Sequence, residues 1–437
     1  MKLLILGSGG REHALALGGL KSSLITHVYV HPGNAGLFLS HGILPLFSVS
    51  LSVPLRHDSK EIVAARAHEL KIDLVVIGPE NLLAQGYADY LSEQGFKVIG
   101  PGKEAAQLES SKGFAKAFME QYGIPTAPYL STNSRREAEQ FIEEAAFSIV
   151  VKADELAQGK GVIVTDTKAE AKAAVCSLLS GRKSVKSQKL VLERRLKGYE
   201  ISSIALVDGD SFFILGYAQD YKRAFDSDLG PNTGGMGAQL DPNWPPPSIQ
   251  RQAEAIFQKS LNGLKDRGLA YQGFMFLGLM IENDQAFLLE YNVRSGDPET
   301  QVLIPSLNID LGLLFLHVTE KTLHQLNHHN IPDQCFVHVV LASGGYPDVD
   351  GQGLDLDRPL FIPVEVADSD QVIIYFAGVD RKVDGGLMNK GGRVLGLTAC
   401  GANVPEAREK VYNALEKIKL EGSFYRKDIG ILENANS

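Results

Sequence analysis

The sequence has few of the features that mark secreted, membrane-spanning or nucleic-acid-binding proteins. Its 437 residues include three cysteines, Cys176, Cys335 and Cys400. These are too few and too far apart for a disulfide framework or a zinc site, so we expect a protein of the reducing cytoplasm. No apolar run approaches the roughly 20 residues that a membrane helix needs. The formal net charge of −9 does not suit binding to the phosphate backbone of a nucleic acid.

Two common nucleotide-binding motifs are also missing. The turn at residues 7–11 is followed by Glu12, where a dinucleotide loop needs its third glycine, and the next strand ends in His31 in place of the acid that holds an NAD ribose. Both positions disfavour a nicotinamide oxidoreductase. Asp154 and Gly161 stand where a Walker A loop needs glycine and then Ser or Thr. The sequence also has no Gly-x-Ser-x-Gly elbow and no Cys/His constellation.

What the chain does contain is ordinary globular material, with 44% hydrophobic and 22% charged residues. The first hundred residues predict a parallel α/β sheet, because apolar runs alternate with helical patterns. The predicted strands are 3–6, 27–30, 74–77 and 97–99, and the predicted helices are 11–20 and 60–70. Each of these strands ends in a glycine-bearing turn or polar loop, and ligands of such sheets bind beyond the carboxyl ends of the strands.

The remainder predicts two further units. A proline-rich break at 124–128 precedes a compact α+β unit with strands 148–152, 162–165 and 189–193 and a helix at 169–179. Other predicted helices are 104–120, 249–267, 310–326 and 405–420. Other predicted strands are 212–218 and 274–281, then 336–341, 371–376 and 394–398, which would make a small C-terminal sheet. We therefore expect domains at 1–103, 104–330, with a small subdomain at about 127–197, and 331–437.

The most informative segment is 290–299, which follows an apolar strand. Because strand side chains alternate, Glu290, Asn292 and Arg294 share one face, roughly 7 Å apart, and Phe287 and Leu289 face the core. Carboxylate and amide oxygens suit Mg²⁺ or Mn²⁺ that also holds phosphates, and a guanidinium suits a substrate carboxylate. Considered alone, the pattern is equally compatible with a solvated polar face.

Cations and glycines elsewhere indicate phosphate binding. Lys152 lies inside an apolar strand, where a lysine is costly unless an anion meets it. Gly159, Lys160 and Gly161 offer backbone N–H groups and a cation to phosphate oxygens, although a plain hairpin turn has the same composition. A glycine turn at a helix start, such as 9–11, also binds phosphate.

Two more segments contain residues suited to binding a nucleotide and a second ligand. The strand end at 190–200 offers backbone groups to an adenine edge and Glu200 to ribose hydroxyls, although a plain strand end is the alternative. Asp220 and Lys222 share one strand face. The glycine cluster at 234–237 predicts a loop that admits a ligand close to the backbone.

In chain order, these segments resemble the ATP-grasp carboxylate–amine ligases over nearly the whole sequence. The matching motifs are 7–14, 32–36, 78–80, 111–116, 152–154, 159–161, 219–223, 230–237, 296–301, 343–347, 391–394 and 425–430. The resemblance implies a multidomain α/β and α+β fold: an N-terminal parallel α/β substrate-binding domain, an ATP-grasp core with a small mobile lid, and a small C-terminal α+β domain.

The motifs are most similar to family members that join glycine to 5-phosphoribosylamine in purine synthesis, with ATP and a glycyl phosphate intermediate. The resemblance implies that Mg²⁺ or Mn²⁺ binds Glu290 and Asn292, and that Lys222, Arg294 and Asp297 are catalytic. It implies ATP binding by Lys112, Lys152, Gly159, Lys160, Gly161, Glu193, Leu196 and Glu200. It implies substrate binding by Gly9, Gly10, Arg11, Asn34, Gly78, Pro79, Glu80, Asp220, Asn232, Thr233 and Gly234.

The implied partners are small molecules alone, with no nucleic acid or membrane, and the implied state is a cytoplasmic monomer. Two alternatives stay open: a ligase of the same family with another carboxylate and amine, and a weakened nucleotide-binding homologue. The sequence departs from the family at Glu155, where glycine is usual, and at Ser295 and 81–86. A carboxylate at 155 would repel ATP phosphates unless it points outward, so we expect weaker ATP binding.

Overall fold

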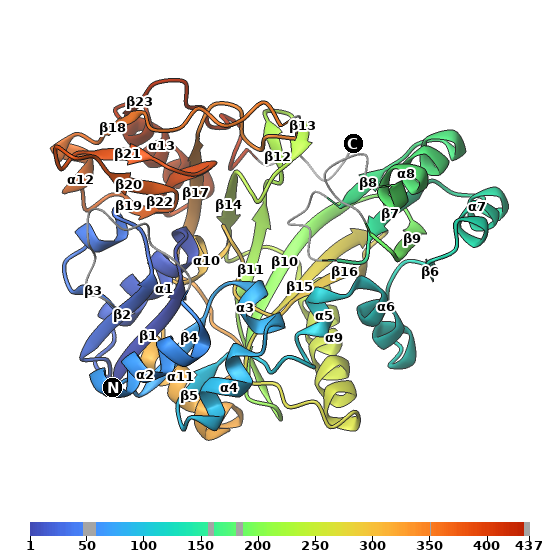
Figure 1. Ribbon diagram of the computed structural model, residues 1–437, viewed down its shortest axis with the longest axis horizontal. Coiled ribbons are helices and arrows are strands. Elements are labelled where there is room, and N and C mark those ends of the chain that lie inside the picture. The colour runs from blue at the N-terminus through green and yellow to red at the C-terminus, as the bar shows by residue number, and fades with distance from the viewer. Residues whose placement is uncertain (47–57, 156–160, 181–186, 350, 432–437) are drawn as a thin grey trace.

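The computed structural model describes residues 1–46, 58–155, 161–180, 187–349 and 351–431. Gly159 and Lys160 of the predicted phosphate loop lie outside these ranges. Figure 1 shows the N-terminal unit in blue, a central sheet in green and yellow, the C-terminal unit in red, and a small green unit at the far edge of the central sheet. Within the described ranges, no helix combines the length and apolar character needed to cross a membrane.

The N-terminal unit is a parallel sheet, as predicted, with the strand order β3-β2-β1-β4-β5 and one strand, β3, that was not predicted. Its strands are β1 (Lys2–Gly7), β2 (His27–Pro32), β3 (Ile43–Pro45), β4 (Leu74–Ile77) and β5 (Lys97–Ile99). Its helices are α1 (Gly10–Leu20), α2 (Lys60–Leu70), α3 (Glu80–Ala84) and α4 (Tyr87–Glu93), with a 3₁₀ turn η1 (Leu37–Leu39). Because β2 and β4 flank β1, the loops after these three strands meet at one edge of the sheet.

The small unit is an antiparallel sheet in the order β6-β9-β7-β8. Its elements are β6 (Tyr129–Thr132), α7 (Arg135–Glu144), β7 (Ile149–Ala153), β8 (Val162–Val164), α8 (Lys168–Ser180) and β9 (Leu190–Arg194). The two helices pack on one face of this sheet, in a core that includes Val151 and Leu192. Because strand side chains alternate, Lys152 and Glu193 project from the opposite face.

An antiparallel sheet runs through the middle of the molecule in the order β16-β15-β10-β11-β14-β17-β22-β19. Its strands come from both the central and the C-terminal parts of the chain. Its strands are β10 (Tyr199–Val207), β11 (Phe212–Asp220), β14 (Gly237–Leu240), β15 (Gly273–Glu282), β16 (Gln285–Asn292), β17 (Cys335–Ala342), β19 (Ile373–Phe376) and β22 (Arg393–Gly401). Since β17 pairs with β14, the strands predicted to form a small C-terminal sheet extend the central sheet instead.

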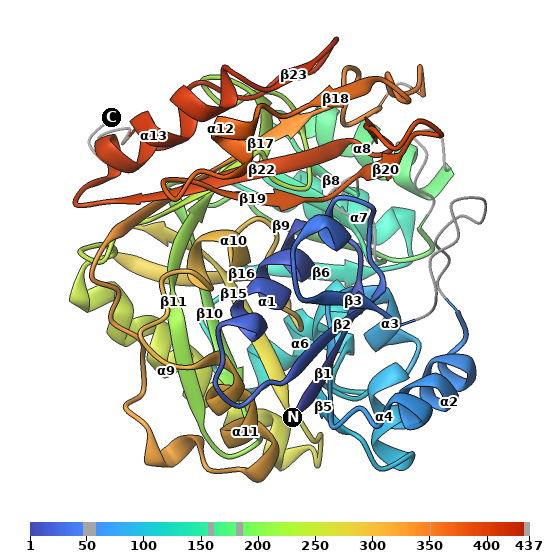
Figure 2. The same ribbon diagram turned by 90° about the vertical axis from the view of Figure 1, so that its left-hand side faces the viewer.

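The remaining elements surround this sheet. They are α5 (Gln107–Ser110), α6 (Lys112–Gln121), β12 (Arg223–Phe225), β13 (Leu229–Asn232), α9 (Pro247–Asp266), α10 (Thr300–Leu303), α11 (Leu311–Glu320), η2 (Leu323–Gln325), α12 (Val364–Ala367) and α13 (Val404–Leu415). A separate sheet, in the order β20-β21-β18-β23, comprises β18 (Pro359–Phe361), β20 (Val379–Arg381), β21 (Leu387–Asn389) and β23 (Lys419–Leu420). Figure 2 shows α1 beside β19, a contact that joins the N- and C-terminal units.

Three predicted helices are shorter than expected. The helix at 104–120 breaks at Ser111, whose backbone is extended and whose Oγ accepts a hydrogen bond from Phe114 N at 3.1 Å, so that α6 begins with its own cap. The helix at 310–326 stops at Lys321, which adopts the left-handed conformation. The helix at 405–420 stops at Leu415, because Leu420 pairs with Leu360 as part of β23.

A β-bulge in β16 corrects the predicted faces of this strand. The register with β15 skips Leu289 between the pairs made by Leu288 and Glu290. Strict alternation predicted Phe287 and Leu289 in the core, but both are half-buried, whereas Leu288 and Tyr291 are buried. The extra residue shifts the alternation by one position. Both ends of the strand therefore keep core contacts while Glu290 stays partly accessible.

Candidate active site

The charge of the Glu290 carboxylate acts on three lysines from separate elements. Lys112 begins α6, Lys152 lies in β7, and Lys222 follows β11. Glu290 is half-buried, and its carboxylate makes no hydrogen bond or ion pair with the described residues. Burial lowers the pKa of Lys112, and Glu290 is the carboxylate that opposes this most. Residues far apart in the sequence thus form one site that joins the predicted metal ligand to the predicted phosphate ligands.

Lys152 is held by a buried ion-pair network. Glu193 Oε1 pairs with Lys152 Nζ, and Glu193 Oε2 lies 2.5 Å from Lys116 Nζ on α6. Burial lowers the pKa of Lys152, but Glu193 and Glu290 outweigh it, so the pKa is raised. Lys152 is therefore a permanent cation in this site. Each Glu193 oxygen faces one lysine, and the backbone of Glu193 lies inside the sheet between Tyr129 and Val150, so the nucleoside contact expected for this residue stays a prediction.

Lys222 bridges two carboxylates. Its Nζ pairs with Glu200 Oε2 and lies 3.0 Å from Asp220 Oδ1. Burial lowers the pKa of Lys222, but Asp220 and Glu200 outweigh it and raise the pKa well above its ordinary value. Burial raises the pKa of Asp220, whereas Lys222 lowers that of Glu200. Lys222 and Glu200 are thus charged at neutral pH, and Glu200 Oε1 stays outside the pair.

The described part of the predicted phosphate loop closes beside Lys112. Ala153 N donates to Gly161 O at 2.8 Å, which joins the loop's two ends. Lys112 Nζ donates to the Glu155 carbonyl oxygen at 3.1 Å, and the Glu155 residue is exposed. The unusual residue at this position therefore contacts Lys112 through its backbone, which a glycine would retain.

The oxygens of Glu290 and Asn292 fit a hard divalent cation. Glu290 is free of described partners, and Asn292 Oδ1 accepts one hydrogen bond, from Arg294 Nη2 at 3.1 Å, leaving a second lone pair. The described residues contain no group of three or more His, Cys, Asp or Glu that could hold a metal, at this site or at another. Two protein ligands leave most of an octahedral shell to phosphate oxygens and water, as is usual for Mg²⁺ with a nucleotide.

Arg294, two residues after Asn292, belongs to a second charged cluster. Its Nη2 lies 3.2 Å from Glu109 Oε1 and its Nε lies 3.7 Å from Glu80 Oε2. Burial lowers the pKa of Arg294, but Glu109 and Glu80 outweigh it and raise the pKa. For Glu109 itself burial prevails and raises the pKa. Carboxylates from α5 and α3 thus fix the guanidinium against the N-terminal unit.

The glycine turns after β1 and β4 meet around Glu12. Gly9 N donates to Glu12 Oε2 at 2.7 Å, and Arg11 Nε donates to Oε1 at 2.6 Å. A Cβ at Gly78 would lie 2.0 Å from Glu12 Oε1, and one at Gly7 would lie 2.5 Å from the carboxyl carbon. The residue that excluded a dinucleotide loop therefore accepts hydrogen bonds within the first turn and fills the space against Gly78 of the second.

The other predicted substrate residues of the N-terminal unit lie beside these turns. Asn34 Nδ2 donates to Ser8 O at 2.8 Å and to Phe376 O at 3.1 Å, so this amide already serves the protein itself. Gly10 begins α1, and Pro79 is the N-cap of α3. Burial raises the pKa of Glu80, but the arginine charges beside it prevail and lower it.

Asp297 and the 232–237 loop complete the cluster. Asp297 Oδ2 lies 2.7 Å from Arg393 Nη2. Burial raises the pKa of Asp297, but Arg393 and Arg11 outweigh it, so the pKa is lowered and the carboxylate is charged. Thr233 Oγ1 donates to the carbonyl of Lys222 at 2.8 Å, and Asn232 Oδ1 accepts from Arg223 Nη1 at 3.4 Å. The loop is thereby tied to the phosphate side of the site.

Several charged residues to which the sequence assigned no role also lie here: Glu12, Glu109, Lys116, Glu299 and Arg393. Glu299 Oε1 accepts a hydrogen bond from Ser202 Oγ at 2.9 Å, and burial raises the pKa of Glu299 to about 7. All but Glu109 stand inside the family motifs, which is the signal that was available for them. Glu109 has no such signal, because only the fold brings α5 against Arg294.

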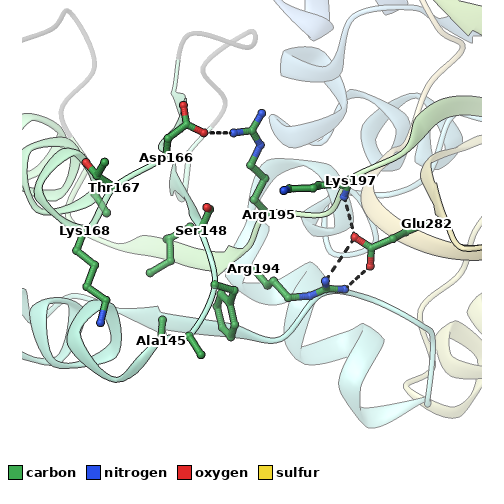
Figure 3. Close-up of a pocket in the computed structure, with 13 residues that line it drawn as sticks. Ala145, Ser148, Asp166, Thr167, Lys168, Arg194, Arg195, Lys197 and Glu282 are labelled. Atoms are coloured by element: carbon green, nitrogen blue, oxygen red, sulfur yellow. Dashed lines mark hydrogen bonds and ion pairs between the residues drawn. The ribbon is translucent and has the colours of Figure 1, made fainter. Parts of the chain in front are cut away.

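A cavity of about 560 Å³ opens where the small unit joins the central sheet (Figure 3). Arg194 pairs with Glu282 at 2.7 Å across it, and Lys197 N donates to Glu282 Oε1 at 2.8 Å. Arg194 and Glu193 are neighbours in β9, so their side chains point to opposite faces of the sheet. The cavity therefore lies on the face away from Lys116 and Lys152, which pair with Glu193. Its described lining includes none of the predicted site residues, and Leu196 is buried nearby in the chain.

Matches to family models cover most of the chain. The N domain of phosphoribosylglycinamide synthetase matches residues 1–109, the ATP-grasp (A) domain matches 110–300, and the C domain matches 336–432. Phosphoribosylamine–glycine ligase of Mesorhizobium japonicum is 41% identical over 434 residues, which is 98% of each chain. The enzyme of the same name from Chlorobaculum tepidum is 39% identical over 436 residues, covering 98% of this chain and 99% of the relative.

Solved structures agree with these matches. The crystal structure of phosphoribosylamine–glycine ligase from Thermotoga maritima has a TM-score of 0.81 and 37% identity, and the match covers 98% of this chain and 100% of that chain. The biotin carboxylase domain of the Hydrogenobacter thermophilus 2-oxoglutarate carboxylase has a TM-score of 0.72 at 14% identity, covering 97% of this chain and 91% of that chain. The second likeness shows the fold alone.

Proposed function

The chain belongs to the phosphoribosylglycinamide synthetase family, and on this premise we propose that it joins glycine to 5-phosphoribosylamine with ATP. The products are glycinamide ribonucleotide, ADP and phosphate, in purine biosynthesis. One observation carries the proposal. Three lysines lie close enough to Glu290 to feel its charge, and Asp297, a few residues further along the chain, is under the influence of Arg11, Arg294 and Arg393. The segment 290–297 therefore carries a site suited to the nucleotide and, next to it, a site suited to the acceptor substrates.

The first step suits the lysine end. A glycine carboxylate oxygen attacks the γ-phosphorus of ATP, the bond to the β–γ bridging oxygen breaks, and ADP leaves as glycyl phosphate forms. Negative charge then moves onto the departing ADP. Lys112, Lys152 and Lys222 would neutralise it, and their catalytic value lies in being fixed before the reaction begins. Leu196 and Glu200 would hold the nucleoside.

We propose that Glu290 and Asn292 hold Mg²⁺ or Mn²⁺ when ATP is bound. The ion would supply charge neutralisation to the phosphate oxygens. Three nearby lysines disfavour a bare cation at Glu290, so its affinity should depend on the nucleotide. The three lysines would orient the phosphates directly through their charge.

The second step suits the arginine end. The amine nitrogen of 5-phosphoribosylamine attacks the acyl carbon, the carbon–oxygen bond to phosphate breaks, and phosphate departs with the electron pair and takes up the proton that the amine loses. Asp297, charged at neutral pH, can accept a hydrogen bond from the amine, and Arg294 can hold the oxygen of the acyl group that began as the carboxylate of glycine. The turn at Gly9, Gly10 and Arg11 would hold the ribose phosphate. Positioning contributes more than acid–base chemistry here.

The test is ADP release by the purified protein with ATP, Mg²⁺, glycine and freshly generated 5-phosphoribosylamine. We expect sustained release only when glycine and 5-phosphoribosylamine are both present, and when the amine is omitted hydroxylamine should trap the acyl phosphate and restore release. Alanine and serine in place of glycine, and ammonia in place of the amine, provide matched controls. Release with one of these pairs and not with glycine and 5-phosphoribosylamine would favour a ligase of different substrates.

A further inference from the structure

The C-terminal unit reaches the active site through the start of β22. Ser343 holds the chain just before this strand, since its N donates to Gly392 O and its Oγ donates to Gly391 O, both at 2.8 Å. Asn389 Nδ2 donates to Ser343 Oγ at 2.7 Å. Arg393 therefore extends from a backbone that is fixed by the core of its own unit.

The Arg393 guanidinium grips two segments of the central domain. Its Nη1 donates to Gly234 O at 2.6 Å and to Asp297 O at 3.2 Å, and its Nη2 donates to Asp297 Oδ2 at 2.7 Å. A planar fork makes these contacts together, which the single ammonium of a lysine cannot do. The 232–237 loop and the Asp297 segment are thereby held in one arrangement.

Tyr346 holds Gly234 from its other side, through the preceding peptide group. Its hydroxyl oxygen accepts a hydrogen bond from Gly234 N at 2.9 Å. The ring lies against Gly392, where a Cβ would stand 2.2 Å from Tyr346 Cδ2. Gly235 has a φ of +107°, and a Cβ there would lie 2.4 Å from Pro298 Cδ. Backbone contact this close requires glycine and leaves the loop little room to shift.

Both partners of this contact keep some exposed surface. The side chains of Arg393 and Asp297 are 22% and 16% exposed. Asp297 therefore presents part of its surface to a ligand while Arg393 fixes its orientation.

We propose that Arg393 and Tyr346 are positioning residues for the glycine and amine half of the reaction. They act by holding Asp297 and the 232–237 loop where the acyl phosphate meets the amine. The inference rests on the proposed function and deepens it, since it gives the C-terminal unit a task in acceptor binding. Among the described residues, neither side chain contacts Lys112, Lys152 or Glu290, so ATP binding should depend on them little.

The test compares Arg393→Met, Arg393→Lys and Tyr346→Phe with Arg358→Met. Arg358 belongs to the same unit and pairs with Asp355 at 2.7 Å on the surface, with its side chain 45% exposed. Losing charge-assisted hydrogen bonds should lower kcat/KM for glycine and for 5-phosphoribosylamine by about 10- to 100-fold in Arg393→Met. The KM for ATP should stay within about threefold of the wild type. Arg393→Lys should recover part of the loss, Tyr346→Phe should show a smaller one, and Arg358→Met none.

Two results would overturn this inference: equal losses for all three substrates together with a lowered melting temperature, or unchanged kinetics in Arg393→Met. A second arm uses Asp297→Asn as the background, where Arg393→Met should add less than about threefold if Arg393 acts through Asp297. If Arg393→Met does not fold, Arg393→Lys and Tyr346→Phe carry the same comparison. A wild-type enzyme that is inactive with both acceptors refutes the proposed function, whereas an active wild type with insensitive variants refutes only this inference.

Discussion

Replacing Glu193 with glutamine tests the buried ion-pair network most directly. In the wild type one carboxylate serves Lys116 and Lys152, and the exposed fractions of the three side chains are 3%, 2% and 9%. The substitution keeps the shape of the side chain but removes its charge, leaving two lysine cations close together in a dry site. Removing one partner of a buried pair costs about 3–5 kcal/mol of stability. The variant should therefore unfold at a clearly lower urea concentration.

The same variant has a second signature in the pH dependence of ATP use. Burial alone lowers the pKa of Lys152, and Glu193 is the main group that raises it above its ordinary value. Without Glu193 this pKa falls, so Lys152 loses its proton at a lower pH. If protonated Lys152 neutralises phosphate, kcat/KM for ATP should fall on the alkaline side at a lower pH than in the wild type.

Unfolding can be followed by circular dichroism and by the emission of Trp244, the single tryptophan. Glu143→Gln is the matched control, because Glu143 pairs with Lys172 on the surface of the same small unit, where both side chains are well exposed. If Glu193→Gln unfolds at the urea concentration of this control and keeps the wild-type alkaline limb, the network has neither of the effects assigned to it.

Four further outcomes are expected. Glu290→Gln should slow ADP release at least about 100-fold and weaken Mn²⁺ binding measured by electron paramagnetic resonance, with an unchanged melting temperature; a normal rate would remove the metal assignment. Gly78→Ala places a Cβ 2.0 Å from Glu12 Oε1, so we expect about 1–3 kcal/mol lower stability in urea and a higher KM for 5-phosphoribosylamine; an unchanged KM would separate the turn from substrate binding. Burial lowers the pKa of His338 from 6.5 to about 3, so the stability it contributes is complete above about pH 6.5 and is lost as the pH falls toward 3. His338→Asn should flatten the decline of urea stability between pH 6.5 and 4 by up to about 1.4 kcal/mol per pH unit, and a wild-type slope would contradict this. Because Glu155 is exposed and meets Lys112 through its carbonyl, Glu155→Gly should lower the KM for ATP less than about threefold; a larger drop would mean that its side chain repels the phosphates.

Local patterns in the sequence predicted much of this architecture. The alternation of apolar runs and helices sufficed for the N-terminal parallel sheet, because its strands are continuous and buried on both faces. A lysine inside the apolar strand of residues 149–153 predicted an anion partner, and the structure pairs Lys152 with Glu193 while Glu290 acts on the same charge. Both are local signals, readable without knowledge of distant neighbours.

What the sequence could not predict depends on partners distant in the chain. The bulge at Leu289 follows from its register against β15, which no property of β16 alone reveals. Glu12 looked like a defect in a glycine motif until Gly78 came within reach of its carboxylate. Glu109 meets Arg294, and Arg393 meets Asp297, through contacts that only the folded chain creates. The pattern of charged residues along a sequence does not indicate which distant residues form ion pairs in the folded chain.

The three arginines around Asp297 also bear on how much of the chain must be present before the acceptor side of the site is complete. Arg11, Arg294 and Arg393 come from the beginning, middle and end of a chain of 437 residues. A chain that stops before residue 393, such as a nascent chain or a proteolytic fragment, lacks the last of these cations. Its acceptor side would then be incomplete even where the lysines around the nucleotide are present, so product formation should require nearly the whole chain.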